Sequence, residues 1–259
     1  MKKTTTILCL GIALCMLGCS DDDDQVTTTS TVPFSLTASL SPRSSDAEDT
    51  GILQGNWDAN SQLAVIKTGS SGVPKSILTR KTDSSDTFTG NLSTLVKNEN
   101  EIAVFYPAAA ITANSSDTLT QTLNLSGQDG TLAGITNYDY LWAQCKAGMN
   151  ETTGSSACEM TSLVTIGKFQ FTVNGGSPLN NITRITITAT AGTLYSSAVM
   201  KLKNGEFSST QTGNITIKNK AGISGTTYIS FFPSEAQLHF TLVTTTCLLY
   251  TSPSPRDRT

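Results

Sequence analysis

Apolar and polar residues alternate along much of the chain, with the period of two that is typical of strands burying one face. The segment 34–40, Phe-Ser-Leu-Thr-Ala-Ser-Leu, is the first clear example. Further alternating or apolar stretches, each bounded by turn residues, lie at 63–66, 87–92, 101–106, 119–125, 138–143, 163–173, 182–190, 194–202, 207–217, 226–232 and 238–243. Because no stretch carries a helical stripe of useful length, the pattern predicts an all-β protein of many short strands.

The predicted strands fall into two sets, separated by a polar stretch at 145–158 that contains Gly and Ser. Many short strands at turn-separated intervals are typical of β-sandwiches. We therefore expect two tandem β-sandwich domains, at residues 33–155 and 156–246. The second set has fewer strands than a closed sandwich needs. Within it, the turn residues at 203–205, Lys-Asn-Gly, predict a β-hairpin.

Residues 1–18 have the layout of a bacterial lipoprotein signal peptide. Two lysines precede an apolar stretch at 7–17 that is too short to span a bilayer. It ends in Met16-Leu17-Gly18-Cys19, which resembles a lipobox, with Met16 where Leu is usual. A signal peptidase would then cut before Cys19, and the acylated cysteine would anchor the chain to a membrane without crossing it. The alternative is an ordinary secretory peptide with an incidental cysteine.

An acidic run follows the candidate lipidation site. It consists of Ser20, Asp21, Asp22, Asp23 and Asp24. Behind a lipidated cysteine, such a run resembles the surface-export signal of Bacteroidetes lipoproteins, whereas elsewhere it is an ordinary solvated linker. The remainder of the segment 19–32 is rich in Thr and lacks a hydrophobic pattern, so we expect a tether.

The last residues, 247–259, have a different character from the rest of the chain. The run Cys-Leu-Leu-Tyr-Thr-Ser-Pro-Ser-Pro-Arg-Asp at 247–257 back-translates to a string that resembles the transposase end and adapter of a sequencing library. The alternative is a natural Pro-rich tail. We expect that residues 247–259 are adapter read-through and that the biological sequence is reliable only to about Thr246.

Composition and charge narrow the classes of function. Serine and threonine make up roughly 28% of the 259 residues, and threonine favours strands. The formal net charge of −3 argues against nucleic-acid binding, which needs a basic surface. His239 is the only histidine, which excludes a His-rich metal site and disfavours Ser-His-Asp or Cys-His catalysis. We therefore expect no enzyme activity, no metal, no cofactor and no nucleic-acid partner.

Several short motifs each occur too often by chance to identify a family, but the order in which they follow one another along the chain is informative. They are Cys19, the stretch 34–40, Arg43, Trp57 before 63–66, Phe105-Tyr106-Pro107, Asp139-Tyr140-Leu141-Trp142-Ala143, 160–173, and Phe231-Phe232-Pro233-Ser234 before 238–243. Over residues 30–246 this order resembles the Bacteroidetes fimbrillin family (Mfa-like, FimA-type). The resemblance implies two tandem transthyretin-like β-sandwich domains, and the family's final strands are absent, so the second domain is expected to be truncated.

The resemblance also implies a function in a cell-surface fimbria (pilus). In polymerising members a trypsin-like protease cuts after an Arg behind the first strand, and a partner's strand then replaces the strand that leaves. Phe34, Leu36 and Leu40 would be the apolar side chains of the removable strand, and Arg43 matches the cleaved position. The implied partners are other fimbrial subunits, with the outer membrane reached through the lipid anchor. The alternative for Arg43 is a solvated loop residue that is never cut.

Three further features are candidate sites. Cys145 and Cys158 could form a disulfide worth about 3 kcal/mol, and two free buried thiols are the alternative. Thr118 lies in an Asp-Thr-Leu triplet that resembles the Bacteroidetes O-glycosylation motif. The aromatic residues Trp57, Tyr138, Tyr140 and Trp142 could line a sugar-binding face or could pack in the core. The sugar-binding interpretation makes a surface glycan-binding lipoprotein the second candidate function.

Overall fold

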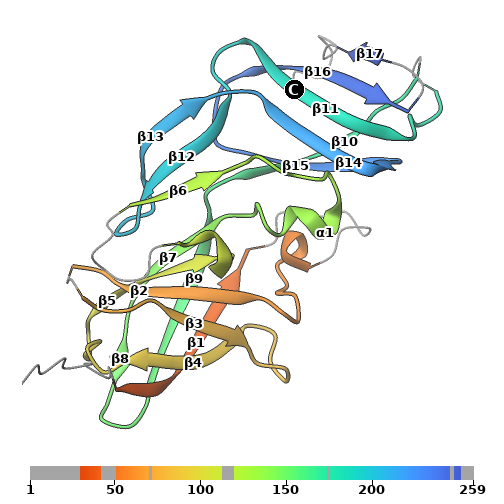
Figure 1. Ribbon diagram of the computed structural model, residues 1–259. Coiled ribbons are helices and arrows are strands. Elements are labelled where there is room, and N and C mark those ends of the chain that lie inside the picture. Colours follow the sequence, from red (N-terminus) through yellow and green to blue (C-terminus); the bar gives the residue numbers. More distant parts are fainter. Residues whose placement is uncertain are drawn as a thin grey trace, which may run out of the picture.

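The computed structural model describes residues 30–41, 51–69, 72–112, 120–173, 176–245 and 248–251. Within these ranges the chain forms seventeen β-strands, two short 3₁₀ helices and one short α-helix, so the all-β prediction is confirmed. Figure 1 shows two lobes, one above the other, with strand β6 and helix α1 near their junction. None of the described helices is long and apolar enough to cross a membrane.

The first lobe is a ring of hydrogen-bonded strands. Its strands are β1 (Thr31–Leu40), β2 (Gln62–Lys67), β3 (Ser76–Arg80), β4 (Thr87–Ser93), β5 (Glu101–Tyr106), β7 (Leu141–Lys146), β8 (Gly148–Met149) and β9 (Gly154–Ser162). Their order is β1-β4-β3-β2-β5-β7-β9-β8, and an additional pairing of β1 with β9 closes the ring. In the described part of the chain, β1–β9 is the one parallel strand pair.

Two strands of the first lobe are buried on both faces, which explains their continuous apolar sequences. In β2, Leu63 and Val65 face the interior of the ring, and Ala64 and Ile66 belong to a second core that continues into the other lobe. Strand β5 divides its side chains in the same way. The two lobes are therefore joined by a shared apolar layer and not only by the chain.

The second lobe contains the later strands together with one strand from the first half of the sequence. Its strands are β6 (Thr120–Asn124), β10 (Thr165–Gln170), β11 (Ile182–Ala191), β12 (Tyr195–Lys201), β13 (Phe207–Thr212), β14 (Ile215–Ile223), β15 (Thr226–Phe231), β16 (Gln237–Thr244) and β17 (Leu248–Thr251). They form the sheets β14-β11-β16-β17, β13-β12-β6 and β10-β15. Their inward residues form a common core, in which Ile185, Ile187, Ile217 and Ile229 are fully buried.

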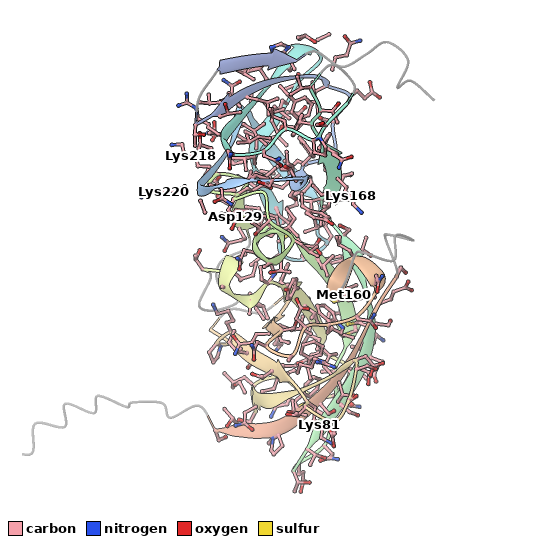
Figure 2. The ribbon with its side chains drawn as sticks, turned by 90° about the vertical axis from the view of Figure 1, so that its right-hand side faces the viewer. Lys81, Asp129, Met160, Lys168, Lys218 and Lys220 are labelled. Carbon is pink, nitrogen blue, oxygen red and sulfur yellow. The ribbon has the colours of Figure 1, made fainter. Side chains whose placement is uncertain are left out.

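The segment 125–140, between β6 and β7, joins the two lobes and contains helix α1 (Leu132–Ile135). The 3₁₀ helices η1 (Gly51–Gln54) and η2 (Ala108–Ala110) lie earlier in the chain. Asp129, labelled in Figure 2, accepts hydrogen bonds from the amide and hydroxyl of Thr131 at 2.9 and 2.8 Å. The buried Gln128 accepts a bond from the Ser230 amide at 2.7 Å and donates one to the Ser230 carbonyl at 3.2 Å. This paired contact holds the connection against β15.

The expected domain boundary between residues 155 and 156 is wrong. It falls inside β9, which belongs to the ring of the first lobe, and β6 pairs with β12 of the second lobe, with Leu123 opposite Ala198. Strand β9 resembles a linker because three of the four residues on its less exposed face, from 154 to 160, are Gly154, Ser156 and Cys158. A strand with small inward residues has no apolar alternation, so the pattern misses it.

Other local predictions have mixed outcomes. The hairpin at 203–205 is confirmed, because β12 and β13 pair antiparallel around it. The single strand expected at 207–217 divides at Gly213-Asn214 into β13 and β14, which lie in different sheets. Strand β17, within the tail interpreted as adapter sequence, pairs with β16. That pairing does not test the interpretation, because an open strand edge offers backbone groups to any extended segment.

Candidate functional site

The candidate site is the strand β1 together with the groove that holds it. On one side β1 pairs antiparallel with β4, from Thr31 opposite Ser93 to Thr37 opposite Thr87. On the other side it pairs parallel with β9, from Phe34 opposite Gly154 to Leu40 opposite Met160. Figure 1 shows β1 in red and orange at the start of the described chain, crossing beside β4. The ring is thus closed by its first strand, which has a partner along both edges.

The inward side chains of β1 fill the interior of the first lobe. Phe34 and Leu36 are 2% and 0% exposed, as the pattern predicted, whereas Leu40 is only half-buried at the end of the strand. Sequence reasoning missed Val32, which was assigned to the tether, and Ala38, although both continue the same alternation. The outward side chains are mostly exposed, so β1 is an amphipathic strand whose apolar face packs against the interior of the first lobe.

A glycine lies opposite Phe34 on each neighbouring strand, and one of them makes room for the Phe34 ring. Gly90 of β4 and Gly154 of β9 are the residues directly opposite Phe34 on its two neighbouring strands. A Cβ atom at Gly154 would lie 2.7 Å from Phe34 Cδ2 and would also collide with Met149. Real Cβ atoms do not approach so closely, so the absence of a side chain at Gly154 is what admits the aromatic ring.

Polar contacts hold the later half of β1. The indole N–H of Trp57 donates a hydrogen bond of 2.6 Å to the Ala38 carbonyl, and the Ala38 amide donates one of 2.9 Å to Asp86. Trp57 is itself buried, edge-on to Phe88 with ring centres 5.1 Å apart. Just beyond the strand, the Ser41 hydroxyl donates to a Glu159 carboxylate oxygen at 2.9 Å. These contacts would have to break for β1 to leave.

The remaining residues expected from the resemblance lie outside the described ranges. They are Cys19, Ser20, Asp21, Asp22, Asp23, Asp24, Arg43 and Thr118. For Arg43 the structure describes only the flanks: β1 ends at Leu40, Ser41 is exposed, and the description resumes at Gly51 in η1. Cleavage at Arg43, lipidation and glycosylation therefore remain predictions.

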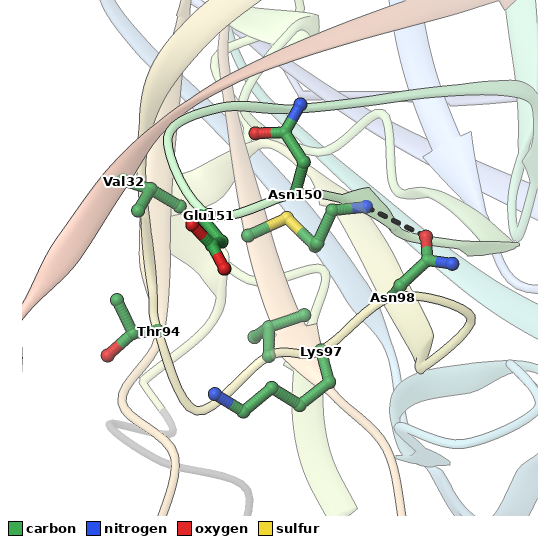
Figure 3. Close-up of a pocket in the computed structure, with 8 residues that line it drawn as sticks. Val32, Thr94, Lys97, Asn98, Asn150 and Glu151 are labelled. Carbon is green, nitrogen blue, oxygen red and sulfur yellow. Dashed lines mark hydrogen bonds between the residues drawn. The ribbon is translucent and has the colours of Figure 1, made fainter.

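A pocket of about 390 Å³ opens at the beginning of β1 (Figure 3). It is lined by Val32, Thr94, Val96, Lys97, Asn98, Met149, Asn150 and Glu151. Its wall is braced by a 3.0 Å hydrogen bond from the Met149 amide to the Asn98 side chain. The lining combines apolar groups with one cation and one anion, and it contains no nucleophile beside a general base.

A second pocket, of about 460 Å³, lies between η1 and α1 and includes the carboxylates of Asp58 and Asp139. Nearby, burial raises the pKa of the Tyr106 hydroxyl above its usual value, and the Asp139 and Asp58 charges add to the effect. Among the residues described, no group of three or more His, Cys, Asp or Glu side chains is placed to hold a metal ion.

Cys145 and Cys158 are both free thiols, and they face each other from β7 and β9. Both are half-buried and pack against the interior of the first lobe. The Cys158 thiol donates a hydrogen bond to Met160 Sδ at 3.9 Å. Interaction with the neighbouring Cys158 side chain lowers the pKa of Cys145 to about 7, and the same interaction raises the pKa of Cys158. The structure describes the two thiols as free, and the disulfide between them remains a prediction.

The aromatic residues do not form a sugar-binding face. Trp57 and Tyr140 are each only 5% exposed. The Tyr140 hydroxyl donates to the Asn124 carbonyl at 2.6 Å, and burial raises its pKa to about 12. Trp142 packs against the core between the lobes and donates its indole N–H to the Leu202 carbonyl at 3.3 Å. A glycan platform needs Tyr140 and Trp142 exposed on one face, so the structure gives this alternative no support.

No protein-family model and no curated protein sequence matches the chain. Among solved structures, a Bacteroides ovatus protein assigned to cell adhesion matches with a TM-score of 0.54 and 15% identity over 86% of each chain. A Bacteroides uniformis protein with the same assignment has a TM-score of 0.52 and 13% identity, over 87% of this chain and 85% of its own. A fimbrial assembly protein from Parabacteroides distasonis has a TM-score of 0.44 and 12% identity, over 86% and 84%.

At these identities the likeness shows the fold alone, and the first two structures, whose TM-scores exceed 0.5, carry it. The assignments of these two structures concern cell adhesion. The chain therefore has the β-sandwich fold of Bacteroides proteins that are assigned to cell adhesion.

Proposed function

We propose that this protein is a structural subunit or anchor of a cell-surface fimbria with a role in adhesion. Its precursor would be held in the outer membrane by a lipid on Cys19 and exported to the surface by the acidic run at 20–24. It would assemble by strand exchange: cleavage after Arg43 frees β1, and a strand of another subunit takes its place. Its partners are then other fimbrial subunits.

The observation that carries the proposal is the construction of β1. It closes the first lobe through ladders on both edges, and its inward side chains sit in the lobe's interior. Main-chain hydrogen bonds and alternating side chains are what β-augmentation uses for affinity and specificity. A segment with these features, followed directly by the stretch that contains Arg43, is suited to being exchanged.

Removing β1 costs free energy, so we expect β1 to leave slowly and a replacing strand to bind tightly. Each large apolar side chain that leaves the interior costs about 1.5–3 kcal/mol, and the ladder hydrogen bonds are lost as well. An open groove is therefore costly, and a foreign strand with matching alternation recovers that cost. Because Gly154 leaves room for the ring of Phe34, an incoming strand would be best matched with an aromatic residue at the same register.

The test is mild trypsin treatment of the full chain, isolated in detergent, beside an Arg43→Gln variant. The expected result is a fragment that begins at residue 44 and then forms ladders of oligomers that resist unheated detergent gels. The variant should give neither the fragment nor the ladder. Arg80→Gln, at an arginine of β3 that pairs with β4 and not with β1, is the matched control and should behave as the wild type. A cut chain that stays monomeric would contradict the proposal.

A further inference from the structure

Two registers bring Cys145 opposite Cys158. Strand β7 pairs with β9 through Leu141 with Ser162 and Trp142 with Thr161. Strand β8 pairs with the other end of β9 through Gly148 with Ser155 and Met149 with Gly154. Both sets belong to a single antiparallel register, and that register continued through the middle of β7 places Cys145 directly across from Cys158.

The same register decides which kind of pair the two cysteines form. The Leu163 amide donates to the Tyr140 carbonyl at 2.8 Å, so residues 140 and 163 are a hydrogen-bonded pair. Antiparallel pairs alternate, so 145 and 158 fall on a non-hydrogen-bonded position of this register, the kind of pair whose side chains lie closer together. A disulfide accepts Cα separations of about 4.4–6.8 Å, and a non-hydrogen-bonded pair in a regular ladder has about 4.5 Å. The interaction of the two cysteine side chains, which lowers the pKa of Cys145, agrees with this placement.

The pair lies in the wall of the β1 groove. Cys158 is opposite Ala38 of β1, and both cysteines pack against the interior cluster that β1 completes. In the described structure, residues 156–160 of β9 have ladder partners on β1 alone, because the β7 pairs involve only 161 and 162 and the β8 pairs only 154 and 155. When β1 leaves, the middle of β9 loses its ladder.

We propose that Cys145 and Cys158 are oxidised to a cross-strand disulfide after export, and that this bond holds β9 against β7 while the β1 groove is open. The first part stands on the geometry alone, and the second rests on the proposed strand exchange. Two S–H bonds are replaced by one S–S bond, and the two electrons and two protons reduce the disulfide of a thiol oxidoreductase of the cell envelope to its dithiol.

Cys145 is the residue that would attack. Nucleophilic attack on a disulfide needs a thiolate, and the lowered pKa of Cys145 supplies one near neutral pH. Cys158 would then displace the oxidoreductase from the mixed disulfide and close the bond. The shared register of β7 and β9 keeps the two residues opposite each other for this second step.

The oxidation state is tested on the full chain, taken from the cell envelope, acid-quenched and blocked with N-ethylmaleimide. Peptide mapping should find the peptides of Cys145 and Cys158 linked and unlabelled, and reduction before blocking should label both. Cys145→Ser should leave Cys158 labelled without reduction. Two labelled cysteines in the unreduced wild type would overturn the disulfide.

The groove role is tested after trypsin has cut at Arg43 and β1 has been removed. A synthetic peptide of residues 31–41 is titrated against the oxidised chain, the same chain after reduction, and the Cys145→Ser/Cys158→Ser variant. Reduction and substitution should each weaken peptide binding by about thirtyfold or more, which corresponds to the roughly 2 kcal/mol at the lower end of a disulfide's usual contribution. Equal affinity in all three would overturn the groove role.

The two proposals fail in different ways. If the peptide binds none of the three preparations, strand exchange fails and the groove role fails with it, while the mapping result still decides whether the disulfide forms. If the peptide binds all three equally, strand exchange survives and only the groove role is lost.

Discussion

Replacing Leu36 by alanine tests directly whether β1 is seated in the interior. Leu36 is 0% exposed and lies between Phe88 of β4 and Ser156 of β9. Deleting a buried leucine side chain removes its transfer free energy and leaves a cavity, which together cost about 2.7–5 kcal/mol. The hydrogen-bonded ladders on both edges of β1 limit how far the neighbouring strands can close the gap. We therefore expect a loss of about 3 kcal/mol in the free energy of unfolding of the first lobe.

The assay is urea unfolding followed by tryptophan fluorescence, because Trp57 lies in the same interior and packs against Phe88. Thr37→Ala is the matched control, since Thr37 is the next residue and points outward. An exposed substitution of this kind should change stability by no more than about 0.5 kcal/mol. After cleavage at Arg43 the same 3 kcal/mol should weaken retention of β1 by about a hundredfold.

The reasoning is refuted if Leu36→Ala and Thr37→Ala have equal effects. That result would mean that the first strand does not bury its alternating face in the lobe. It would remove the groove from the structural argument and the proposed exchange with it. A large loss of stability without faster release of β1 would instead show that the polar contacts at Ala38 and Ser41 control release.

Three further predictions concern the same groove. Trp57→Phe keeps an aromatic ring but removes the hydrogen bond to β1, so unfolding measured in urea should become easier by about 1–3 kcal/mol and cleaved β1 should dissociate faster. Gly154→Ala forces a Cβ against the ring of Phe34, so the melting temperature should fall, by an amount corresponding to about 1–3 kcal/mol. In the reduced chain, alkylation of Cys145 by iodoacetamide should rise with pH around 7, and Cys158→Ala should move that rise towards pH 9, because the thiol that stabilises the thiolate is gone.

The alternation of residues 34–40 was enough to predict the strand and two of its buried side chains. Its length was not predicted correctly, because Val32 continues the pattern into a Thr-rich stretch that looks like a tether. The candidate chemistry was only partly predictable. The residues of the signal, the acidic run, Arg43 and Thr118 were identified from motifs alone, and they lie outside the described ranges. For the two cysteines the sequence left a disulfide and two free thiols as alternatives, and their position opposite each other depends on a strand register.

Period-two alternation and turn residues are local properties of the sequence. They were enough to predict that the protein is all-β, where most of its strands lie, and that residues 203–205 form the turn of a hairpin. Only the tertiary structure decided that β1 closes a ring with β9, that β6 joins the second lobe, and that Trp57 and Tyr140 are buried. The physical reason is that strand pairing uses backbone groups that every residue carries. A partner 120 positions away, such as Gly154 for Phe34, leaves no mark in the local pattern.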